Sequence, residues 1–272
     1  MNMANLLTLA AAVPSKSVQA TGWFLETAWL IPALPALSFF LILFFGKKMK
    51  YKGAEFGITA IALSLILAIC CVGQWMNQVD NASDNYKKNT PYETEEKYSE
   101  TSSQVLEENA SAEPIEVASA EQMNIYAAGE ESGYEAVAVD AVIERFTWWE
   151  TGGKKFQVGI MVDGLAVMML FVVTVISLLV HIYSTDYVSG DRRYTHYFAF
   201  LSLFSASMLF FVLSENILQT IVGWELVGVC SFALIGHWWE EKPNSDAALK
   251  AFLTNRVGDM GLLVGMIILF WS

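Results

Sequence analysis

Residues that bind metals and haems are scarce in this sequence. It has three cysteines and three histidines among 272 residues, and the cysteines form no CxxC pair. Cys70 and Cys71 are adjacent and Cys230 lies in another apolar run, so we interpret all three as packing residues rather than redox groups. Nucleotide-binding glycine motifs, a nucleophile elbow and zinc-ligand spacings are missing too. The sequence therefore predicts no cofactor or metal bound by the chain, and it does not look like an enzyme on its own.

Basic residues are few, and the charge is unevenly distributed. The net charge is −12, but residues 77–155 alone hold 17 of the 28 acidic residues and 6 of the 16 basic ones. Their Ser-, Glu- and Asn-rich composition predicts a largely disordered acidic loop, with a short surface helix at 136–149. This loop either concentrates cations at a membrane surface or is a tolerated insertion. We divide the chain into 1–76, 77–155 and 156–272.

Long apolar runs fill the remaining sequence. Hydrophobic residues make up 54% of the chain, more than the ~45–50% of soluble domains. Six runs are long enough to cross a bilayer as helices, at about Trp29–Phe45, Phe56–Trp75, Gly159–Tyr183, Tyr197–Leu213, Ile217–Trp238 and Ala251–Trp271. We predict an all-α fold, a polytopic transmembrane helix bundle with two helices before the acidic insert and four after it. The first 16 residues favour an interfacial or frayed helix over a signal peptide, because no basic residue precedes their apolar run.

The short loops predict an orientation. Three of them lie on one side of the membrane if six helices alternate, and these three carry basic residues, at 46–54, 184–196 and 239–250. The positive-inside bias places that side in the cytoplasm. The acidic segment 77–155 then lies on the non-cytoplasmic side of the membrane.

Glu225 is the most informative residue, because it lies in the middle of an apolar run. Helical geometry places its carboxylate near the bilayer centre, where a charge costs at least ~2.5 kcal/mol. Such residues favour proton or cation handling, and the alternative is a protonated glutamate hydrogen-bonded across helices. Gly223 and Gly228 beside it permit a close approach of another helix.

The sixth run repeats this pattern. Arg256 and Asp259 are three residues apart, so they share a helix face and can pair. The pair either seals a helix interface or opens and biases the protonation of Glu225. Lys250 lies at the cytoplasmic mouth, as a topology signal or a weaker part of the same pathway.

Four further polar residues flank the helices. His181 and His196 border the loop 184–196, as interface residues or as minor proton relays. His237 lies near the end of the fifth run and has the same two interpretations. Asp163, just inside the third run, favours an N-cap or loop-anchoring role over a transport role.

Three stretches together resemble a known family. HIYSTDY at 181–187, GWELVGVCS at 223–231 and NRVGD at 255–259, with their apolar surroundings, closely resemble the L-type subunit of bacterial proton-pumping NADH:quinone oxidoreductase, respiratory complex I. The large subunit of Mrp-type antiporters matches them less well. The resemblance is strong over about 115 residues and looser at 26–76.

The resemblance implies roles for the buried charges. Glu225 corresponds to the family's fifth-helix glutamate, Asp259 to its sixth-helix aspartate, and Arg256 to the arginine one turn earlier. In the family these residues work with a lysine on a seventh helix. The chain ends at Ser272, so we expect a continuation or a partner chain to supply the remaining helices.

The resemblance also implies partners. It predicts a membrane-arm subunit of a proton-pumping NADH:quinone oxidoreductase, a translocase in which NADH, FMN, iron–sulfur clusters and quinone bind to partner subunits. Other membrane-arm subunits and the lipid bilayer are its expected partners, and nucleic acid is not. Two rivals remain, a fragment of a Mrp-type Na⁺/H⁺ antiporter and a non-conducting scaffold remnant.

Overall fold

The computed structural model describes residues 18–19, 22–49, 51–89, 139–151 and 154–271. It contains two compact units. The first comprises Met1–Gln19 and Asn77–Asp140, where β1 (Val18–Gln19) pairs in parallel with β2 (Val139–Asp140). The second comprises Ala20–Met76 and Ala141–Ser272 and contains the helix bundle. The predicted N-terminal helix and residues 90–138 of the acidic loop lie outside the described residues.

Six long helices dominate the described residues. Each is long and apolar enough to cross a membrane, and they are α3 (Leu30–Phe45), α4 (Ala54–Asn89), α7 (Gly164–Tyr187), α8 (Tyr194–Val212), α9 (Ile217–Ile235) and α10 (Lys242–Trp271). A short helix α2 (Trp23–Glu26) precedes α3, and one 3₁₀ turn, η1 (Gly46–Lys48), follows it. The prediction of six membrane-length helices is confirmed.

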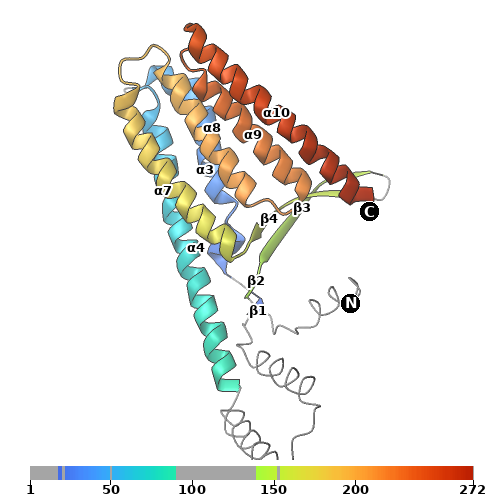
Figure 1. Cartoon of the computed structure of the whole chain (residues 1–272). Coiled ribbons are helices and arrows are strands. Elements are labelled where there is room, and N and C mark those ends of the chain that lie inside the picture. Colours follow the sequence, from blue (N-terminus) through green and yellow to red (C-terminus); the bar gives the residue numbers. More distant parts are fainter. Residues whose placement is uncertain (1–17, 20–21, 50, 90–138, 152–153, 272) are drawn as a thin grey trace, which may run out of the picture. The chain divides into compact units, whose positions relative to one another are not determined.

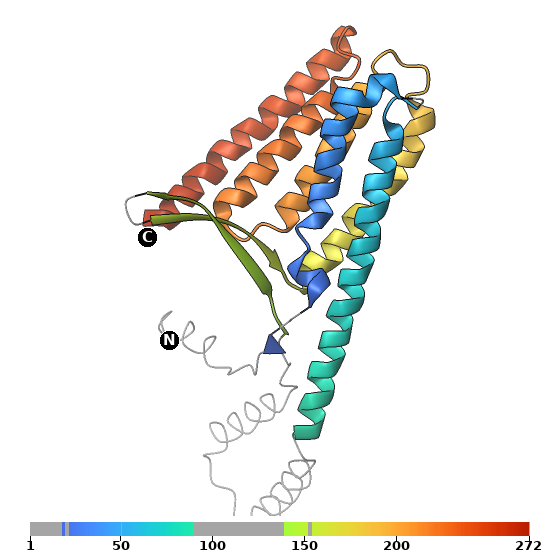
Figure 2. The same ribbon diagram turned by 180° about the vertical axis from the view of Figure 1, so that it is seen from behind.

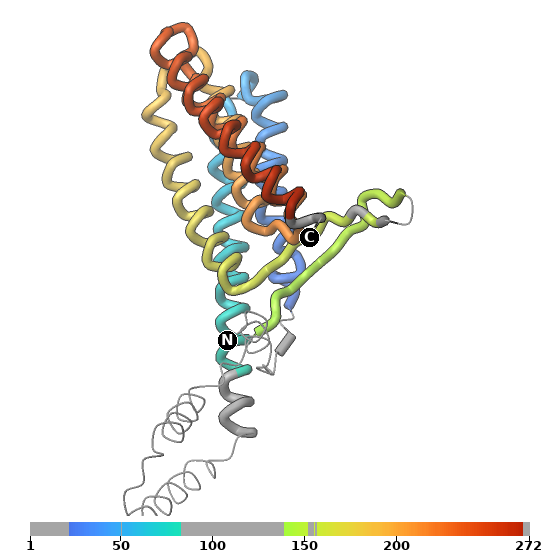
Figure 3. Tube along the Cα trace, turned by 45° about the vertical axis from the view of Figure 1, so that its right-hand side comes forward, coloured from blue at the N-terminus to red at the C-terminus, as the bar shows by residue number. Residues whose placement is uncertain are grey.

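Helix α8 lies at the centre of the bundle. It packs against α3, α7 and α9, and half of its membrane-length window is buried. Figure 2 shows α3 crossing α8, and Figures 1 and 3 show α10 beside α9 at one edge. Short polar side chains allow helices to approach closely. Four buried hydroxyl side chains of α8 are of this kind: Thr195, Ser202, Ser205 and Ser207.

The basic loops gather at one end of the bundle (Figure 1). A small core closes this end, where Phe198 of α8 packs with Ile42, Ala54 and Val188. Gly46 is needed in the first loop, because a Cβ there would lie 2.7 Å from Cγ2 of Thr195. The loops therefore pack on the start of α8.

A β-hairpin lies at the opposite end of the bundle and corrects one prediction. β3 (Val142–Thr151) pairs antiparallel with β4 (Lys154–Val162), so the predicted surface helix at 136–149 is wrong. The Val-, Phe-, Trp- and Thr-containing segment prefers an extended strand once a partner strand is present. The hairpin docks on the α8–α9 loop, where Arg145 pairs with Glu215 at 2.7 Å and the Met161 N–H donates to Leu213 O at 3.0 Å.

Helix ends also differ from the predictions. α4 continues to Asn89, so residues 77–89 are helical and not part of a disordered loop. α7 begins at Gly164, because residues 159–162 belong to β4. Asp163 caps α7 by accepting a 2.7 Å hydrogen bond from the Ala166 N–H, which confirms the predicted N-cap.

Candidate functional site

Glu225 and Arg256 form an ion pair between α9 and α10. Glu225 lies near the middle of α9, and about a third of each of the two side chains is exposed. The sequence alone could place both residues on apolar helices but could not show that they meet. Their pairing supplies each charge with a counter-ion where few waters are available.

Arg256 also contacts Asp259 on its own helix. Its Nη1 lies 3.4 Å from Oδ2 of Asp259, as the three-residue spacing predicts. The guanidinium carbon lies 4.6 Å from the centre of the Phe252 ring, one turn earlier. One arginine therefore serves two carboxylates, and the cluster has one more negative than positive charge when both acids are ionised.

Trp224 completes this cluster. Its indole Nε1 donates a 2.8 Å hydrogen bond to Oδ1 of Asp259. Two consecutive residues of α9, Trp224 and Glu225, therefore contact charged side chains of α10. Asp259 thus has two donors, whereas Glu225 has only Arg256 among the described residues. Sequence reasoning did not assign Trp224 a role. The only signal available was its position directly before the buried glutamate.

A small cavity adjoins the cluster. It measures about 80 Å³ and is lined by Glu225, Arg256, Asp259, Gly228 and Ser231, among others. At ~30 Å³ per water this space holds two or three molecules, and its polar walls can bind them. A methyl group at Gly228 would lie 4.0 Å from the Arg256 guanidinium, an ordinary contact distance, so the arginine does not require a glycine at this position.

Gly223 lets α9 approach α8 closely. A Cβ built on it would lie 2.9 Å from both Cα and Cβ of Phe211, closer than side chains pack. This contact holds the turn of α9 that carries Trp224 and Glu225. The expected role of Gly223 in close helix packing is confirmed.

His181 is fully buried among α4, α7 and α8. Its Nδ1 lies 2.7 Å from the Ser177 carbonyl, and its Nε2 lies 3.5 Å from Oγ of Ser202. The hydroxyls of Ser177 and Ser205 are 2.5 Å apart one turn away. A Cβ at Gly57 would be 3.1 Å from the imidazole. The histidine is therefore a partner in a line of hydroxyl groups between α7 and α8.

The other predicted residues lie apart from the charge cluster. Lys250 is exposed on α10, six residues before Arg256, and does not line the cavity. His196 is exposed on the first turn of α8. The structure thus brings together Glu225, Arg256 and Asp259.

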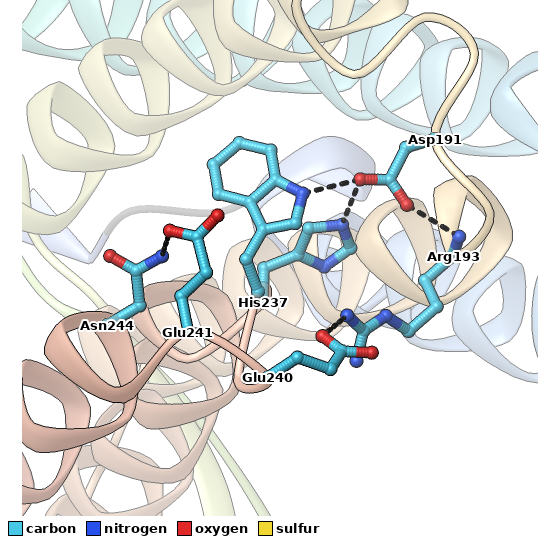
Figure 4. A network of polar contacts seen from close by, with 7 residues as sticks. Asp191, Arg193, His237, Glu240, Glu241 and Asn244 are labelled. Carbon is cyan, nitrogen blue, oxygen red and sulfur yellow. Dashed lines mark hydrogen bonds and ion pairs between the residues drawn. The ribbon is translucent and has the colours of Figure 1, made fainter.

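A second polar network joins the α7–α8 and α9–α10 loops (Figure 4). Asp191 accepts a 2.6 Å hydrogen bond from the Trp238 indole, and its Oδ2 lies 3.4 Å from Nε2 of the buried His237. Arg193 pairs with Glu240. The Arg193 backbone N–H donates to Asp191 and is the main cause of a lowered pKa for that carboxyl. Burial lowers the pKa of His237, and Asp191 opposes the shift.

These features define a class of protein. The described residues form six membrane-length helices, with carboxylates and an arginine paired at mid-helix between α9 and α10, and this defines a polytopic α-helical membrane protein with ionisable groups on its membrane-length helices. The model of complex I chain 5 N-terminus matches residues 148–198, and that of the NADH:quinone oxidoreductase/Mrp antiporter transmembrane region matches 214–272. In these two regions the chain is similar to the antiporter-like membrane subunits that these models describe.

Curated relatives agree with this assignment. NAD(P)H-quinone oxidoreductase chain 5 of Synechocystis is 46% identical over 125 residues, which are 46% of this chain and 18% of the relative. F(420)H(2) dehydrogenase subunit L of Methanosarcina mazei is 36% identical over 244 residues, 90% of this chain and 27% of the relative. The chain thus spans about a fifth to a quarter of the length of these relatives.

A solved structure shares the fold. A chain of the membrane-bound sulfane sulfur reductase, an archaeal respiratory membrane complex, matches with a TM-score of 0.54 at 14% identity. The match covers 88% of this chain and 36% of that chain. The two chains therefore share a fold over the matched part.

Proposed function

We propose that this chain is part of a membrane-arm, antiporter-like subunit of a proton-pumping quinone oxidoreductase. Its role is to contribute part of a transmembrane proton pathway. The observation that carries the proposal is the ion pair of Glu225 with Arg256 between two membrane-length helices. Charges at this depth are costly and serve ion pathways in most known cases, and the named relatives are oxidoreductase subunits.

The proposed mechanism is a shared cation. Arg256 contacts Glu225 and also lies 3.4 Å from Asp259, whose other oxygen is held by Trp224. A rotation of the guanidinium toward Asp259 leaves Glu225 without a counter-ion. A carboxylate without a counter-ion in a poorly hydrated site takes up a proton, and it releases the proton when the cation returns. Water in the adjoining cavity supplies or receives that proton.

Three further residues have smaller proposed roles. Lys250 contributes positive charge at the mouth of α10, where its long side chain reaches the interface. His181 relays protons along the hydroxyl line of Ser177, Ser202 and Ser205, and His196 exchanges them with the aqueous side. These residues form a branch separate from the Glu225 cluster.

The central test replaces Glu225 by Gln in the assembled membrane complex. We expect proton pumping, followed as a pH change in inverted vesicles, to fall at least about tenfold, because the amide cannot carry the proton. The matched control is Glu241→Gln, since Glu241 is exposed in the α9–α10 loop and, among the described residues, its side chain bonds only to Asn244. Unchanged pumping in a fully assembled Glu225→Gln complex would leave the scaffold interpretation in place of the transport role.

A Na⁺/H⁺ antiporter of the Mrp type is the second candidate, because the matching transmembrane model covers both families. The two differ in their partners. A quinone oxidoreductase brings NADH-, FMN- and iron–sulfur-binding subunits with it, together with quinone and other membrane-arm subunits. Purification through a tag on this chain tests this, since co-purifying flavin and iron favour the oxidoreductase. A purified complex that lacks flavin and iron but produces sodium-dependent pH changes in vesicles favours the antiporter.

We further propose the orientation and the setting. The basic loops at one end of the bundle face the cytoplasm of a bacterial cell by the positive-inside bias, and the acidic segment 77–155 faces the other side. Because this chain matches only about a fifth to a quarter of the relatives' length, further helices in this chain or a partner chain complete the pathway. A cysteine placed at Ser189 should then react with a membrane-impermeant thiol reagent in inverted vesicles and not in intact cells.

A further inference from the structure

A second, larger cavity opens at the basic end of the bundle. It measures about 530 Å³, within the ~300–1,000 Å³ of small-molecule sites. The turn before α4 and the first turn of α4 form one side, and the end of α7 and the loop to α8 form the other. The cavity shares no residue with the Glu225 cluster, so an inference from it is independent of the proton pathway.

One cation and one anion line this cavity. Lys52 lies in the turn before α4, and Glu55 lies in the first turn of α4. Neither forms an ion pair with another residue that the structure describes, which leaves both charges available to a ligand. The Lys52 ammonium lies 5.9 Å from the centre of the Tyr194 ring, which holds it at the cavity wall.

The turn that presents Lys52 is structurally defined. Lys52 has φ +50° and Gly53 has φ +96°, a conformation that favours glycine at the second position. A Cβ at Gly53 would lie 2.9 Å from the Ile42 side chain, so α3 packs directly against the turn. The position of the lysine therefore follows from the packing of the bundle.

The cavity lies at headgroup depth. Ala54 is the first residue of one membrane-length segment and Tyr194 of another, and both line the cavity. The loops that contribute to the cavity also carry Lys48 and Arg192, and basic residues of this kind at a membrane surface attract lipid phosphates. Ile58, one turn farther along α4, adds an apolar wall toward the membrane interior.

We propose that this cavity binds the headgroup of an aminophospholipid of the phosphatidylethanolamine type. The phosphate lies against Lys52 and the loop hydroxyl of Ser189, the primary ammonium lies against Glu55, and the acyl chains leave along Ile58. A purely anionic headgroup would meet the repulsion of Glu55. A choline headgroup carries no N–H that could donate to this carboxylate, and charge-assisted hydrogen bonds are the stronger ones.

The test uses photoactivatable lipids in the assembled complex. The complex is reconstituted in phosphatidylcholine vesicles that contain a few mole per cent of a phosphatidylethanolamine, phosphatidylglycerol or phosphatidylcholine probe with the same photoreactive chain. Labelled peptides are then identified by mass spectrometry. We expect the ethanolamine probe to label the region 51–58 preferentially, and Lys52→Ala and Glu55→Gln each to reduce this labelling about tenfold, the factor for 1.4 kcal/mol.

Lys155→Ala is the matched control, since Lys155 is an exposed lysine on β4 of the hairpin and does not line the cavity. This variant should be labelled as strongly as the wild type. Equal labelling by the choline probe, or full labelling of both cavity variants, overturns the proposal. Water-soluble glycerophosphoethanolamine should not compete; if it abolishes labelling at low concentration, the ligand is a free headgroup compound instead of a lipid. If Lys52→Ala fails to assemble, Glu55→Gln and the wild-type probe series still decide the outcome.

Discussion

The Trp224 indole donates a 2.8 Å hydrogen bond to Oδ1 of Asp259, and this bond joins the two helices that carry the charge cluster. The same turn of α9 places Glu225 on Arg256. α9 thus contributes one neutral donor and one acid, whereas α10 contributes the cation and the other acid. A bond from Trp224 keeps Asp259 in place if the arginine moves, so the tryptophan positions the switch without taking part in proton transfer.

Trp224→Phe tests this positioning role. The substitution keeps an aromatic ring near Phe211 but removes the donor, and the loss of one hydrogen bond to a charged group costs about 1.5–3 kcal/mol. We expect pumping to fall several-fold at unchanged assembly and to shift its pH profile, because Asp259 then depends on Arg256 alone. Trp148→Phe, in an exposed position of the hairpin, should have neither effect. A Trp224→Phe complex with the wild-type pH profile contradicts the role.

A double-mutant cycle tests the pair of Glu225 and Arg256. Arg256→Gln leaves two acids without their cation, and breaking a pair inside a protein costs up to about 3–5 kcal/mol when it is buried. Because both side chains are about one-third exposed, we expect less than this limit. Adding Glu225→Gln should restore part of the loss, with a coupling energy of about 0.5–3 kcal/mol in the thermal stability of the complex. Additive losses show that the pair is not energetically coupled.

Gly223→Ala tests the contact between α8 and α9. The new methyl group would lie 2.9 Å from Phe211 Cα, and overpacking of this kind costs about 1–3 kcal/mol. The control is Gly261→Ala on α10, where a Cβ meets nothing within 4 Å among the described residues. We expect a lower melting temperature only for the first variant, and reduced pumping with it, because the turn that carries Glu225 is displaced. Equal stability of both variants contradicts the close approach.

The sequence predicted the helices well because apolar runs of membrane length have few alternative structures. It also predicted the Arg256–Asp259 pair and the Asp163 cap, since both depend on spacing within one helix. It could not predict the bond of Trp224 to Asp259 or the hydroxyl partners of His181, because these require knowing how neighbouring helices rotate. The hairpin was missed for a similar reason.

The hairpin shows the limit most clearly. Residues 142–151 contain apolar and aromatic residues without strict alternation, and their pairing with 154–162 decides the conformation. Because the sequence before them is acidic and polar, we predicted a loop with a short surface helix. Strand pairing is a contact between segments and has only a weak local signature.

The loop network around His237 predicts a pH dependence. Burial lowers the pKa of His237 below its ordinary value of 6.5, so the unfolded chain binds a proton that the folded loop does not. The contribution to stability is therefore fully present above pH 6.5 and is lost as the pH falls below that value. Asp191, with its pKa below the ordinary 3.8, stays ionised throughout this range and does not add to the change.

Hydrogen exchange of the two loops, residues 188–193 and 236–241, measures this effect between pH 5 and pH 8. After correction for the intrinsic exchange rates, we expect protection to decrease toward pH 5 in the wild type. His237→Gln should show a flat profile, because glutamine does not titrate. His196→Gln is the matched control, since His196 is exposed, and its loops should keep the wild-type profile. Should the His237→Gln loops lose protection with acid as the wild type does, another group near the loops controls their opening.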